Sequence, residues 1–583
     1  MSAPLAQSLT GAWDALPEPV RRRLALSSTG WRHLAQAGAL CLGLARGAGE
    51  PSEHARLTAL AAELVLWAWG ENPLSGPLAA EILSAPELPL PEASRAGLAA
   101  VADNWRVPEA KDGGLAYFER LAKQRDTQKL ADFLAVQVQK APTALFWREK
   151  ALALALYAAE PDVRAALETT ALGGLDAAPA LAPVAGTLKA QAAFLRGDTA
   201  ACLDSLRTLD GLFGPGFAPA RAGLALLAAG DEPAAAAPLL RALKAAPWQA
   251  NLAQVAADAA SGLRRELAPL PGPALIMLYT WNKAADLDAT LASLLHSDLH
   301  GAKVMVLDNG STDATPQVLD AWANRAGENL LRVTLPINIG APAARNWLAA
   351  TPEAKAADVL IYLDDDVALS RDWLGRLGAA LRRHPEAGVV GCKVADHHAP
   401  HLLQNVAGHL VIPADAPCDE NGDRPDLDFQ SLTPNPFRLC DAHLQGPDWG
   451  LFDFVSPCAS VTGCCHLFRR EAIHAPNAAG GGFSLALGPS QYDDFERDLR
   501  MLDSGSNAVY TGHLRVGHRK RSGLASQAEA AGAGAAGNRY KMQCMHPRQE
   551  IARHIEAQAQ RLEAHLTAGL ALLDTTYSEG PDA

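Results

Sequence analysis

The sequence predicts a two-part protein: an α-helical N-terminal region followed by an α/β domain with a mostly parallel, Rossmann-like sheet. Three observations predict this fold. Alanine and leucine recur at helical spacing through roughly the first 260 residues. A proline-rich segment at 268–273 ends that pattern. After it, short apolar runs of strand length alternate with helical segments, which is typical of a parallel sheet covered by helices on both faces.

The composition is that of a large folded protein with an acidic balance. Its 583 residues exceed one hydrophobic core and indicate about two to four domains. A net charge of −13 argues against a general nucleic-acid or anionic-membrane binder, so any site for a polyanion must be local. No apolar stretch is long enough to span a bilayer, and the N-terminus lacks an export signal. Nine cysteines without a C-x-x-C pair favour free thiols. We therefore expect a cytoplasmic protein without an integral membrane segment.

The N-terminal region is predicted to consist of helical hairpins. The turn Leu195-Arg196-Gly197-Asp198 is echoed 33 residues later by Ala228-Ala229-Gly230-Asp231, near the tetratricopeptide period of 34. Residues 140–265 resemble tetratricopeptide repeats on this spacing, whereas 1–139 are predicted to form more degenerate hairpins. An irregular helical bundle remains the alternative. Because solenoids present concave surfaces, we expect this region to bind a protein partner or the acceptor.

The second region reads as alternating strands and helices from residue 272 onward. The predicted strands are Leu275–Tyr279, Val304–Leu307, Leu331–Leu335, Val359–Leu363 and a run at Val389-Val390. The predicted helices are Leu287–Leu295, Thr315–Ala326, Ala341–Ala350 and Asp372–His384. Ligands of such sheets bind beyond the carboxyl ends of the strands, so the residues that end each strand are the candidates for chemistry.

Polar residues end three of these strands. The first strand ends in Thr280-Trp281-Asn282, the second is followed by Asp308–Asp313, and the fourth by Asp364-Asp365-Asp366. Asp308 alone is better explained as a turn or capping residue, although its carboxylate is also an acceptor for a nucleobase edge. Three adjacent carboxylates repel one another, which a divalent cation such as Mg²⁺ or Mn²⁺ relieves. A solvated loop is the alternative for the triplet.

Taken together, these motifs and their order resemble glycosyltransferase family 2, the inverting enzymes of the GT-A fold. The likeness covers about residues 272–522 and leads us to expect a GT-A domain over 272–540. It is carried by Thr280-Trp281-Asn282, Asp308–Asp313, Asn338-Ile339-Gly340, Arg345-Asn346, Tyr362–Asp366, Gly463, Arg469-Arg470, Tyr492–Glu496, Leu499-Arg500 and His518.

The resemblance implies a role for each matching residue. Asp366 and His518 would hold Mn²⁺ or Mg²⁺, with His397, His398 and His513 as competing imidazoles. Asp494 would be the general base, with Asp493 as the fallback; a helix dipole that favours two acids at its N-terminus is the alternative. Gly463 and Trp449 would contact the acceptor, with Phe452 a further candidate. The nucleotide sugar would contact Thr280, Asn282, Asp308, Asn309, Arg345, Asp364, Asp365, Arg519 and Lys520.

Two further segments are interpreted from composition. The Gly/Ala-rich stretch 523–537 reads as a lid over bound donor or as a plain linker. Residues 541–583 are predicted to form a C-terminal helix and polar tail that packs back on the domain or forms a dimer contact; the oligomeric state stays open. A zinc site at Cys458, Cys464, Cys465 and His466 is disfavoured, because adjacent residues of a strand point to opposite faces.

The predicted function is metal-dependent inverting transfer of a sugar from a nucleotide-sugar donor to a hydroxyl of a glycan or protein acceptor. The alternative is a catalytically inactive glycosyltransferase-like scaffold that binds nucleotide or glycan. A sugar nucleotidylyltransferase is disfavoured, because the loop after the first strand is not glycine-rich. A dinucleotide-dependent oxidoreductase is disfavoured too, because no G-x-G-x-x-G follows a strand.

Overall fold

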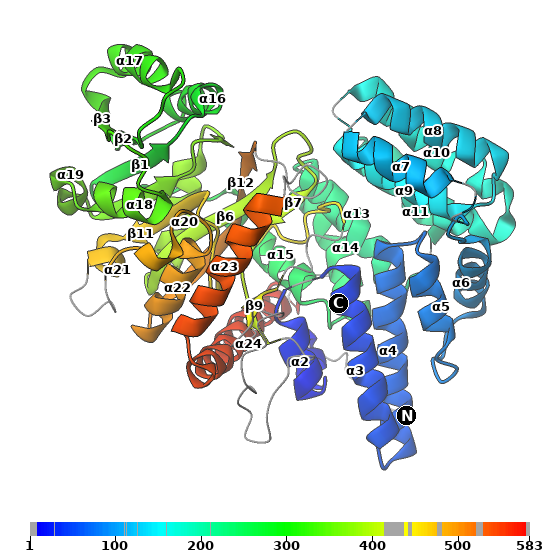
Figure 1. The fold of residues 1–583 in the computed structure, drawn as a ribbon. Helices are drawn as coiled ribbons and strands as arrows, with labels where there is room; N and C mark the ends of the chain where they lie inside the picture. Colours follow the sequence, from blue (N-terminus) through cyan, green and yellow to red (C-terminus); the bar gives the residue numbers. More distant parts are fainter. Residues whose placement is uncertain are drawn as a thin grey trace. The chain divides into compact units, whose positions relative to one another are not determined.

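A computed structural model describes residues 8–578, except 28, 110, 112, 125, 159, 210, 413–436, 441–445, 475–480 and 520–528 (Figure 1). The chain divides into two compact units. One, the helical unit, comprises Met1–Ala260, Ala442–Phe452 and Leu566–Ala583. The other, the sheet unit, comprises Ser261–Asp441 and Asp453–His565. The change from helical to alternating pattern in the sequence therefore coincides with a change of structural unit.

The helical unit consists of a succession of α-helices joined by short turns. Its longest hairpin pairs α3 with α4, which lie side by side along their lengths (Figure 1). The helices are α1 (Leu9–Asp14), α2 (Glu18–Leu24), α3 (Trp31–Gly47), α4 (Pro51–Glu71), α5 (Gly76–Leu83), α6 (Glu92–Asn104), α7 (Gly114–Gln124), α8 (Thr127–Lys140), α9 (Leu145–Tyr157), α10 (Pro161–Leu172), α11 (Ala182–Leu195), α12 (Thr199–Leu206), α13 (Phe217–Ala228), α14 (Glu232–Ala245) and α15 (Ala250–Ala260).

The repeated Gly-Asp turn has the same physical basis in both hairpins. Gly197 and Gly230 adopt positive φ angles of 73° and 81°, which a residue without a Cβ adopts readily. Asp198 and Asp231 then accept a backbone N–H from the first turn of the next helix, at 3.0 and 3.1 Å. The helices after these turns differ in length, 8 residues in α12 against 14 in α14. The helical hairpins are confirmed, but a tetratricopeptide repeat is not established.

The sheet unit is built around one large mixed sheet with the strand order β10-β12-β6-β11-β4-β1-β2-β3. Six of these strands run in one direction; β11 is antiparallel to both β4 and β6, and β10 is antiparallel to β12. The mostly parallel sheet is thus confirmed, with two reversed strands inserted. The strands are β1 (Ala274–Thr280), β2 (Lys303–Asp308), β3 (Leu330–Thr334), β4 (Val359–Leu363), β5 (Val367–Ala368), β6 (Ala387–Asp396), β7 (Leu403–Asn405), β10 (Val455–Cys458), β11 (Cys465–Arg469) and β12 (Asn507–His518).

Helices and a shared apolar core support the sheet. Leu278 of β1, Leu287 of α16 and Ile361 of β4 are fully buried in one cluster. The strands and the helix predicted from the sequence therefore contribute to the same core. The helices are α16 (Ala284–Leu295), α17 (Thr315–Ala326), α18 (Ala341–Ala349), α19 (Pro352–Ala356), α20 (Trp373–Arg383), α21 (Arg470–His474), α22 (Asp493–Asp503), α23 (Glu529–Met545) and α24 (Arg548–Ser578), together with a two-stranded ribbon of β8 (Leu410–Val411) and β9 (Arg438–Leu439).

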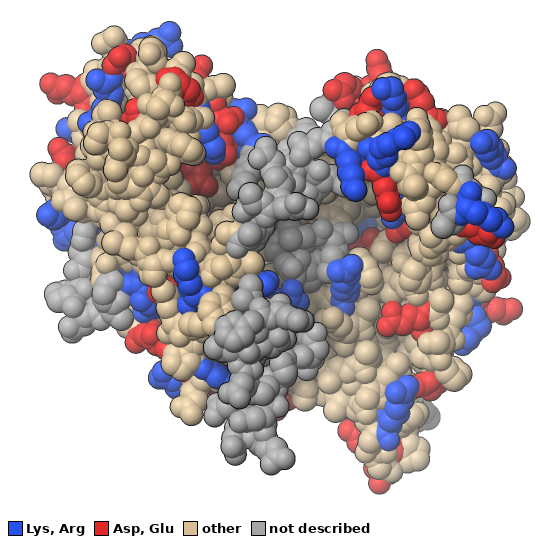
Figure 2. All heavy atoms as spheres, in the orientation of Figure 1, with Lys and Arg blue, Asp and Glu red and all other residues tan. Residues whose placement is uncertain are grey.

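The described residues bear on three expectations: membrane spans, surface charge and the state of the cysteines. No helix among them is both long and apolar enough to cross a bilayer. On the face drawn in Figure 2, acidic and basic side chains are interspersed rather than gathered into a field of one sign. The cysteines that the structure describes are all free thiols, as the sequence predicts.

Candidate functional site

The carboxyl ends of three adjacent parallel strands bring the predicted polar residues to one edge of the sheet. Thr280 at the end of β1 pairs with Asp308 at the end of β2, and β4 lies on the other side of β1. The acidic triplet follows β4 directly. The Thr290 hydroxyl of α16 donates to the backbone oxygens of Asp365 and Val367, both at 2.9 Å. This buried anchor fixes the acidic loop against the sheet.

His518 reaches the acidic loop through strand pairing. It ends β12 and pairs with Val367 of the short strand β5, next to Asp366. As a result its Nε2 lies 3.0 Å from Asp366 Oδ1 and 4.0 Å from Asp364 Oδ2. The other ring nitrogen, Nδ1, lies 2.7 Å from Gln404 Oε1 of β7. This partner holds the proton on Nδ1 and presents Nε2 to the carboxylates.

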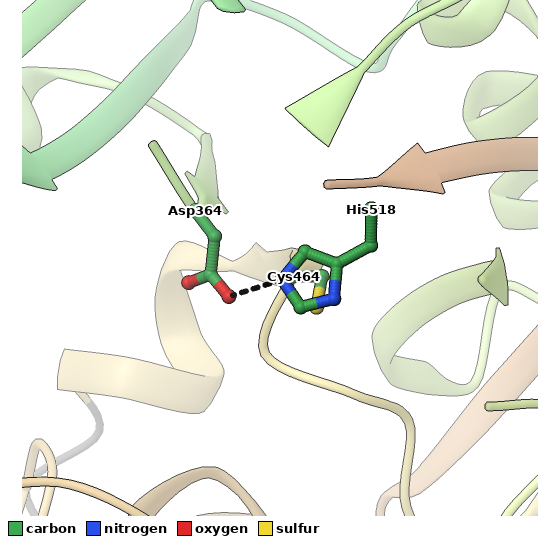
Figure 3. Close-up of side chains that lie close together, drawn as sticks. All are labelled: Asp364, Cys464 and His518. Atoms are coloured by element: carbon green, nitrogen blue, oxygen red, sulfur yellow. Dashed lines mark ion pairs between the residues drawn. The ribbon is translucent and has the colours of Figure 1, made fainter. Parts of the chain in front are cut away.

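A thiol completes this group of potential ligands. Asp364, Cys464 and His518 each offer an atom, and the three atoms lie within 4.8 Å of one another (Figure 3). Cys464 comes from the segment before β11, and the N–H of Asp364 donates to its backbone oxygen at 3.1 Å. Its neighbour Cys465 lies in the apolar core, and His466 pairs with Asp498 at 3.0 Å. The disfavoured zinc arrangement therefore does not assemble among the described residues.

Lys283 supplies a counter-charge to the acidic loop. Its Nζ donates to Asp365 Oδ1 at 3.0 Å and to Asp366 Oδ2 at 2.7 Å. Burial raises the pKa of Asp365 to about 6. Burial also disfavours the charged form of Asp366, but His518 and Lys283 outweigh it and hold the pKa of Asp366 well below its usual range. Asp366 is thus an ionised carboxylate whose Oδ1 faces the imidazole.

A buried ion pair links the acidic loop to the N-terminus of α22. The Arg345 side chain of α18 is 6% exposed, and its Nη1 donates to Asp493 Oδ2 at 2.5 Å. Its Nη2 lies 3.6 Å from Asp364 Oδ1. The guanidinium also lies over the rings of Tyr279 and Phe483, 5.4 and 5.2 Å from their centroids. Arg345 therefore holds together side chains from four separate segments.

Asp494 occupies a different environment from its neighbour. Its Oδ2 accepts the N–H of Gly463 at 2.7 Å, and its Oδ1 accepts the N–H of Phe495 at 2.9 Å. It is half-buried, whereas Asp493 is 2% exposed. A Cβ added to Gly463 would lie 2.9 Å from Asp494 Oδ2 and 2.8 Å from Arg345 Nη2. Only glycine therefore fits this close approach without displacing one of them.

These groups surround a cavity of about 560 Å³. Six predicted site residues line it: Arg345, Asp364, Gly463, Asp493, Asp494 and His518. The sequence reading missed three of its lining residues that carry chemistry, namely Cys464, Arg438 of β9 and Arg539 of α23. The two arginines lie about 100 residues apart in the chain, and no local motif marks them.

The predicted residues at the ends of β1 and β2 form a framework and do not line this cavity. Asn282 Oδ1 accepts the N–H groups of Thr312 and Asp313, at 2.7 and 3.3 Å. Asp308 is 1% exposed, and its Oδ1 accepts the Ser311 N–H at 2.9 Å. Asn309 bonds Asn338 and the N–H of Ile339, both at 3.0 Å. Thr280 is fully buried.

The remaining predicted residues lie elsewhere. Arg519 donates its backbone N–H to the oxygen of Asp366 at 2.8 Å, while its side chain contacts His397 at 3.1 Å. Trp449 belongs to the helical unit, is 6% exposed, and stacks on Phe194 with ring centroids 4.4 Å apart. This placement does not support a sugar-stacking role for Trp449. Lys520 and residues 523–528 of the predicted lid or linker lie outside the described residues, whereas 529–537 belong to α23.

Residues 276–406 match the family model described as glycosyl transferase family 2. The match identifies a glycosyltransferase domain in the chain and confirms the resemblance carried by the strand-end motifs. It ends before Gly463, Asp493, Asp494 and His518, so the placement of these residues comes from the structure alone. No curated protein matches the chain.

Three solved structures are similar to parts of this chain. GalNAc-T7 with UDP, GalNAc and Mn²⁺ is 16% identical with a TM-score of 0.30, over 42% of this chain and 44% of that chain. Mannosyltransferase PcManGT from Pyrobaculum calidifontis with GDP-Man and Mn²⁺ is 17% identical with a TM-score of 0.31, over 57% and 88%. S. aureus TarS is 16% identical with a TM-score of 0.25, over 41% and 36%. This chain spans less than half of the GalNAc-T7 and TarS chains.

Proposed function

We propose that the protein is a metal-dependent inverting glycosyltransferase that moves a sugar from a nucleotide-sugar donor to a hydroxyl of a glycan or protein acceptor. One observation carries the proposal. The ligand group of Asp364, Cys464 and His518, which suits a divalent cation, and a separate half-buried carboxylate, Asp494, border the same cavity, and residues 276–406 match the family 2 model. These are the two sets of groups that a single displacement at an anomeric carbon needs.

The ligand atoms fit a divalent cation. Asp366 Oδ1 and His518 Nε2 are the proposed ligands; Gln404 fixes the tautomer, and Lys283 occupies the other Asp366 oxygen. Asp364 and Cys464 each offer a further ligand atom, and these atoms lie within 4.8 Å of each other and of a ring nitrogen of His518. Carboxylate oxygen and imidazole nitrogen suit Mn²⁺ or Mg²⁺, with the nitrogen favouring Mn²⁺. A bound cation supplies charge neutralisation for the diphosphate of the departing nucleotide.

The residues at the ends of β1 and β2 are proposed to hold the nucleotide end of the donor. Asp308 uses one oxygen to fix the turn before α17, and we assign its other oxygen to the nucleobase edge. Asn282 and Asn309 act as positioning residues, because their side chains tie neighbouring loops together. Arg345 is proposed to offset the negative charges of Asp493 and Asp364 on the side of the cavity where the donor sugar would bind.

Asp494 is the proposed general base. Both acids line the cavity, but Asp493 is 2% exposed and paired with Arg345, whereas Asp494 is half-buried and not paired with a cation in the described contacts. The N–H groups of Gly463 and Phe495 hold the Asp494 carboxylate in one orientation. In the proposed step Asp494 accepts the proton of the acceptor hydroxyl, whose oxygen attacks the anomeric carbon from the face opposite the nucleotide. One displacement of this kind inverts the configuration.

The helical unit is proposed to bind a partner or the acceptor. Its support is the run of helical hairpins with small residues between paired helices, for example Gly223, whose added Cβ would lie 2.6 Å from Leu239. Such close pairing builds rigid helical surfaces of the type used for protein binding. The test is transfer to candidate acceptors by the full chain and by variants of exposed positions on these helices.

A thermal-shift screen of nucleotide sugars with Mn²⁺ tests the proposed activity. The correct donor, at about 100 times its dissociation constant, should stabilise the protein by about 2.7 kcal/mol. Asp366→Asn should lose the metal-dependent part of the shift, while Asp320→Asn, an exposed acid on α17, should keep it. If no donor raises the melting temperature of the wild-type protein, the proposal fails. Binding without transfer or donor hydrolysis would instead favour the inactive scaffold.

A further inference from the structure

A second group of potential metal ligands lies where α22 ends against α24. Asp503 is the last residue of α22, and Glu550 and His554 are one turn apart on α24. One ligand atom from each lies within 4.8 Å of the others. Asp503 is partly exposed, whereas His554 is 7% exposed. The group is therefore open to solvent on one side and backed by a buried imidazole.

The distances in this group are those of donor atoms around one ion. His554 Nε2 lies 3.2 Å from Asp503 Oδ1 and 3.9 Å from Glu550 Oε1. Metal bonds of about 2.0–2.2 Å at a tetrahedral ion place neighbouring donor atoms about 3.4 Å apart. Although two carboxylates are this near, Nε2 of His554 makes no hydrogen bond of acceptable geometry. A buried polar atom normally has a partner. A cation bound between the two carboxylates would give His554 Nε2 that partner.

Neighbouring side chains hold the proposed ligands in place. His546 Nδ1 lies 2.6 Å from Glu550 Oε1, and its Nε2 lies 3.8 Å from Glu496 Oε1. Arg500 in turn binds both oxygens of Glu496, at 2.7 and 3.0 Å. Ligating carboxylates with oriented outer partners of this kind are typical of built metal sites. The Glu550 and His554 pair also has the i, i+4 spacing that places two ligands on one face of a helix.

We propose that Asp503, Glu550 and His554 bind a divalent transition ion of the Zn²⁺ class, with water at the fourth position. The ion joins the end of α22 to α24. The same helices already pack through Leu499, Leu502 and Ile551, so the ion reinforces an existing apolar contact. Because α22 begins with Asp493 and Asp494, the site stabilises the helix that carries these acids. The inference does not depend on the proposed transferase activity.

Zinc binding to the full-length protein tests the inference. His518→Gln is used as the parent variant. It removes a ligand from the group of Asp364, Cys464 and His518 and leaves the proposed ligands on α22 and α24 unchanged. After removal of metal with a chelator, the parent is titrated with Zn²⁺ against a chromophoric competitor, and bound zinc is counted by mass spectrometry. We expect one equivalent. Asp503→Asn on this background should weaken binding by at least about tenfold, since loss of even an outer partner costs about 10–100-fold.

Two further variants make the test specific. His554→Gln on this background should also fail to bind the one equivalent of Zn²⁺. Glu556→Gln changes an exposed acid of the same helix and should bind Zn²⁺ with unchanged affinity. Zn²⁺ should raise the melting temperature of the parent and of Glu556→Gln, but not of Asp503→Asn. Absence of bound zinc in the parent, or unchanged affinity in Asp503→Asn or His554→Gln, would overturn the proposal. Asp503 lies at the surface, so its variant reports on binding without disturbing the core.

Discussion

The helical unit and the edge of the sheet are organised by different rules. In the helical unit, each turn is set by residues next to one another, such as Gly230 at positive φ followed by Asp231 as a cap. At the sheet edge, Asp366, Arg345 and His518 meet residues from distant parts of the chain through strand pairing and buried ion pairs. Replacing an aspartate that caps a helix should therefore lower stability only slightly. Replacing an aspartate at the sheet edge should affect catalysis or the stability of the whole protein.

The largest effect is expected for Asp494→Asn. The amide keeps the shape and accepts the N–H groups of Gly463 and Phe495, but it does not take a proton. Turnover should fall by about 10²–10⁴-fold, while donor affinity stays within a factor of about two of wild type. Steady-state kinetics and donor titration measure the two quantities. Near-wild-type turnover would remove Asp494 from the mechanism and direct attention to Asp493.

Asp493→Ala should reduce stability more than the loss of a helix cap in the helical unit. It removes the closest counter-charge of the buried Arg345 and leaves Asp364 at 3.6 Å as its nearest ion pair among the described contacts. Breaking one partner of a buried pair costs about 3–5 kcal/mol, and we expect about 3 because Asp364 remains. Denaturant unfolding measures the loss. A cost below about 1 kcal/mol would mean that Arg345 is held chiefly by the Tyr279 and Phe483 rings.

Glu496→Gln should change the response to acid. Burial by itself raises the pKa of Glu496, but the nearby His546 imidazole and two hydrogen bonds from Arg500 outweigh it and lower the pKa. A depressed folded-state pKa contributes stability above the unfolded value of about 4.3, and this contribution is lost as pH falls through the folded pKa. The variant should therefore be about 2 kcal/mol less stable at pH 7. The difference from wild type should shrink below about pH 4.3.

Unfolding free energies measured from pH 7 to pH 3 check this expectation. Glu328→Gln, an exposed acid near β3, is the control and should track the wild-type curve. A difference between Glu496→Gln and wild type that stays constant with pH would contradict the assigned pKa direction.

The smallest effects are expected at the helix caps. Asp231→Ala and Asp198→Ala should each cost about 1 kcal/mol, because each removes one side-chain acceptor from a first-turn N–H. Asp204→Ala, a side chain that is 79% exposed and caps no helix, should cost less than about 0.5 kcal/mol. Thermal unfolding compares the three variants. Unequal costs at Asp198 and Asp231 would show that the two hairpins are not equivalent units.

The sequence predicts well what depends on local pattern. Every predicted strand and helix from Leu275 to His384 has its counterpart from β1 to α20, since apolar runs and helical periods alternate cleanly there. Asp364–Asp366 lie at the edge of the sheet, as predicted, because they directly follow the apolar run of β4. The C-terminal helix predicted within residues 541–583 has its counterpart in the long helix α24.

What the sequence does not reveal depends on long-range pairing. The short strand β11 carries no signal of its direction in its sequence, so its antiparallel insertion between β4 and β6 is not predicted. In β12 the register shifts between Thr511 and Arg515, which interrupts the alternation of a regular strand. Arg438 and Arg539 reach the cavity only through the packing of distant segments. Trp449 was assigned to the acceptor by its aromatic character, but it is packed within the helical unit.

We propose that a divalent cation at Asp366 and His518 and a base at Asp494 perform glycosyl transfer at the cavity that His518 and Asp494 line. Release of nucleoside diphosphate from the donor found in the screen tests it most directly, measured with Mn²⁺ and with a chelator for the wild type and Asp366→Asn. Release by the wild type should depend on Mn²⁺ and should be lost in Asp366→Asn. Equal release in the chelator, or in Asp366→Asn with Mn²⁺, would contradict it.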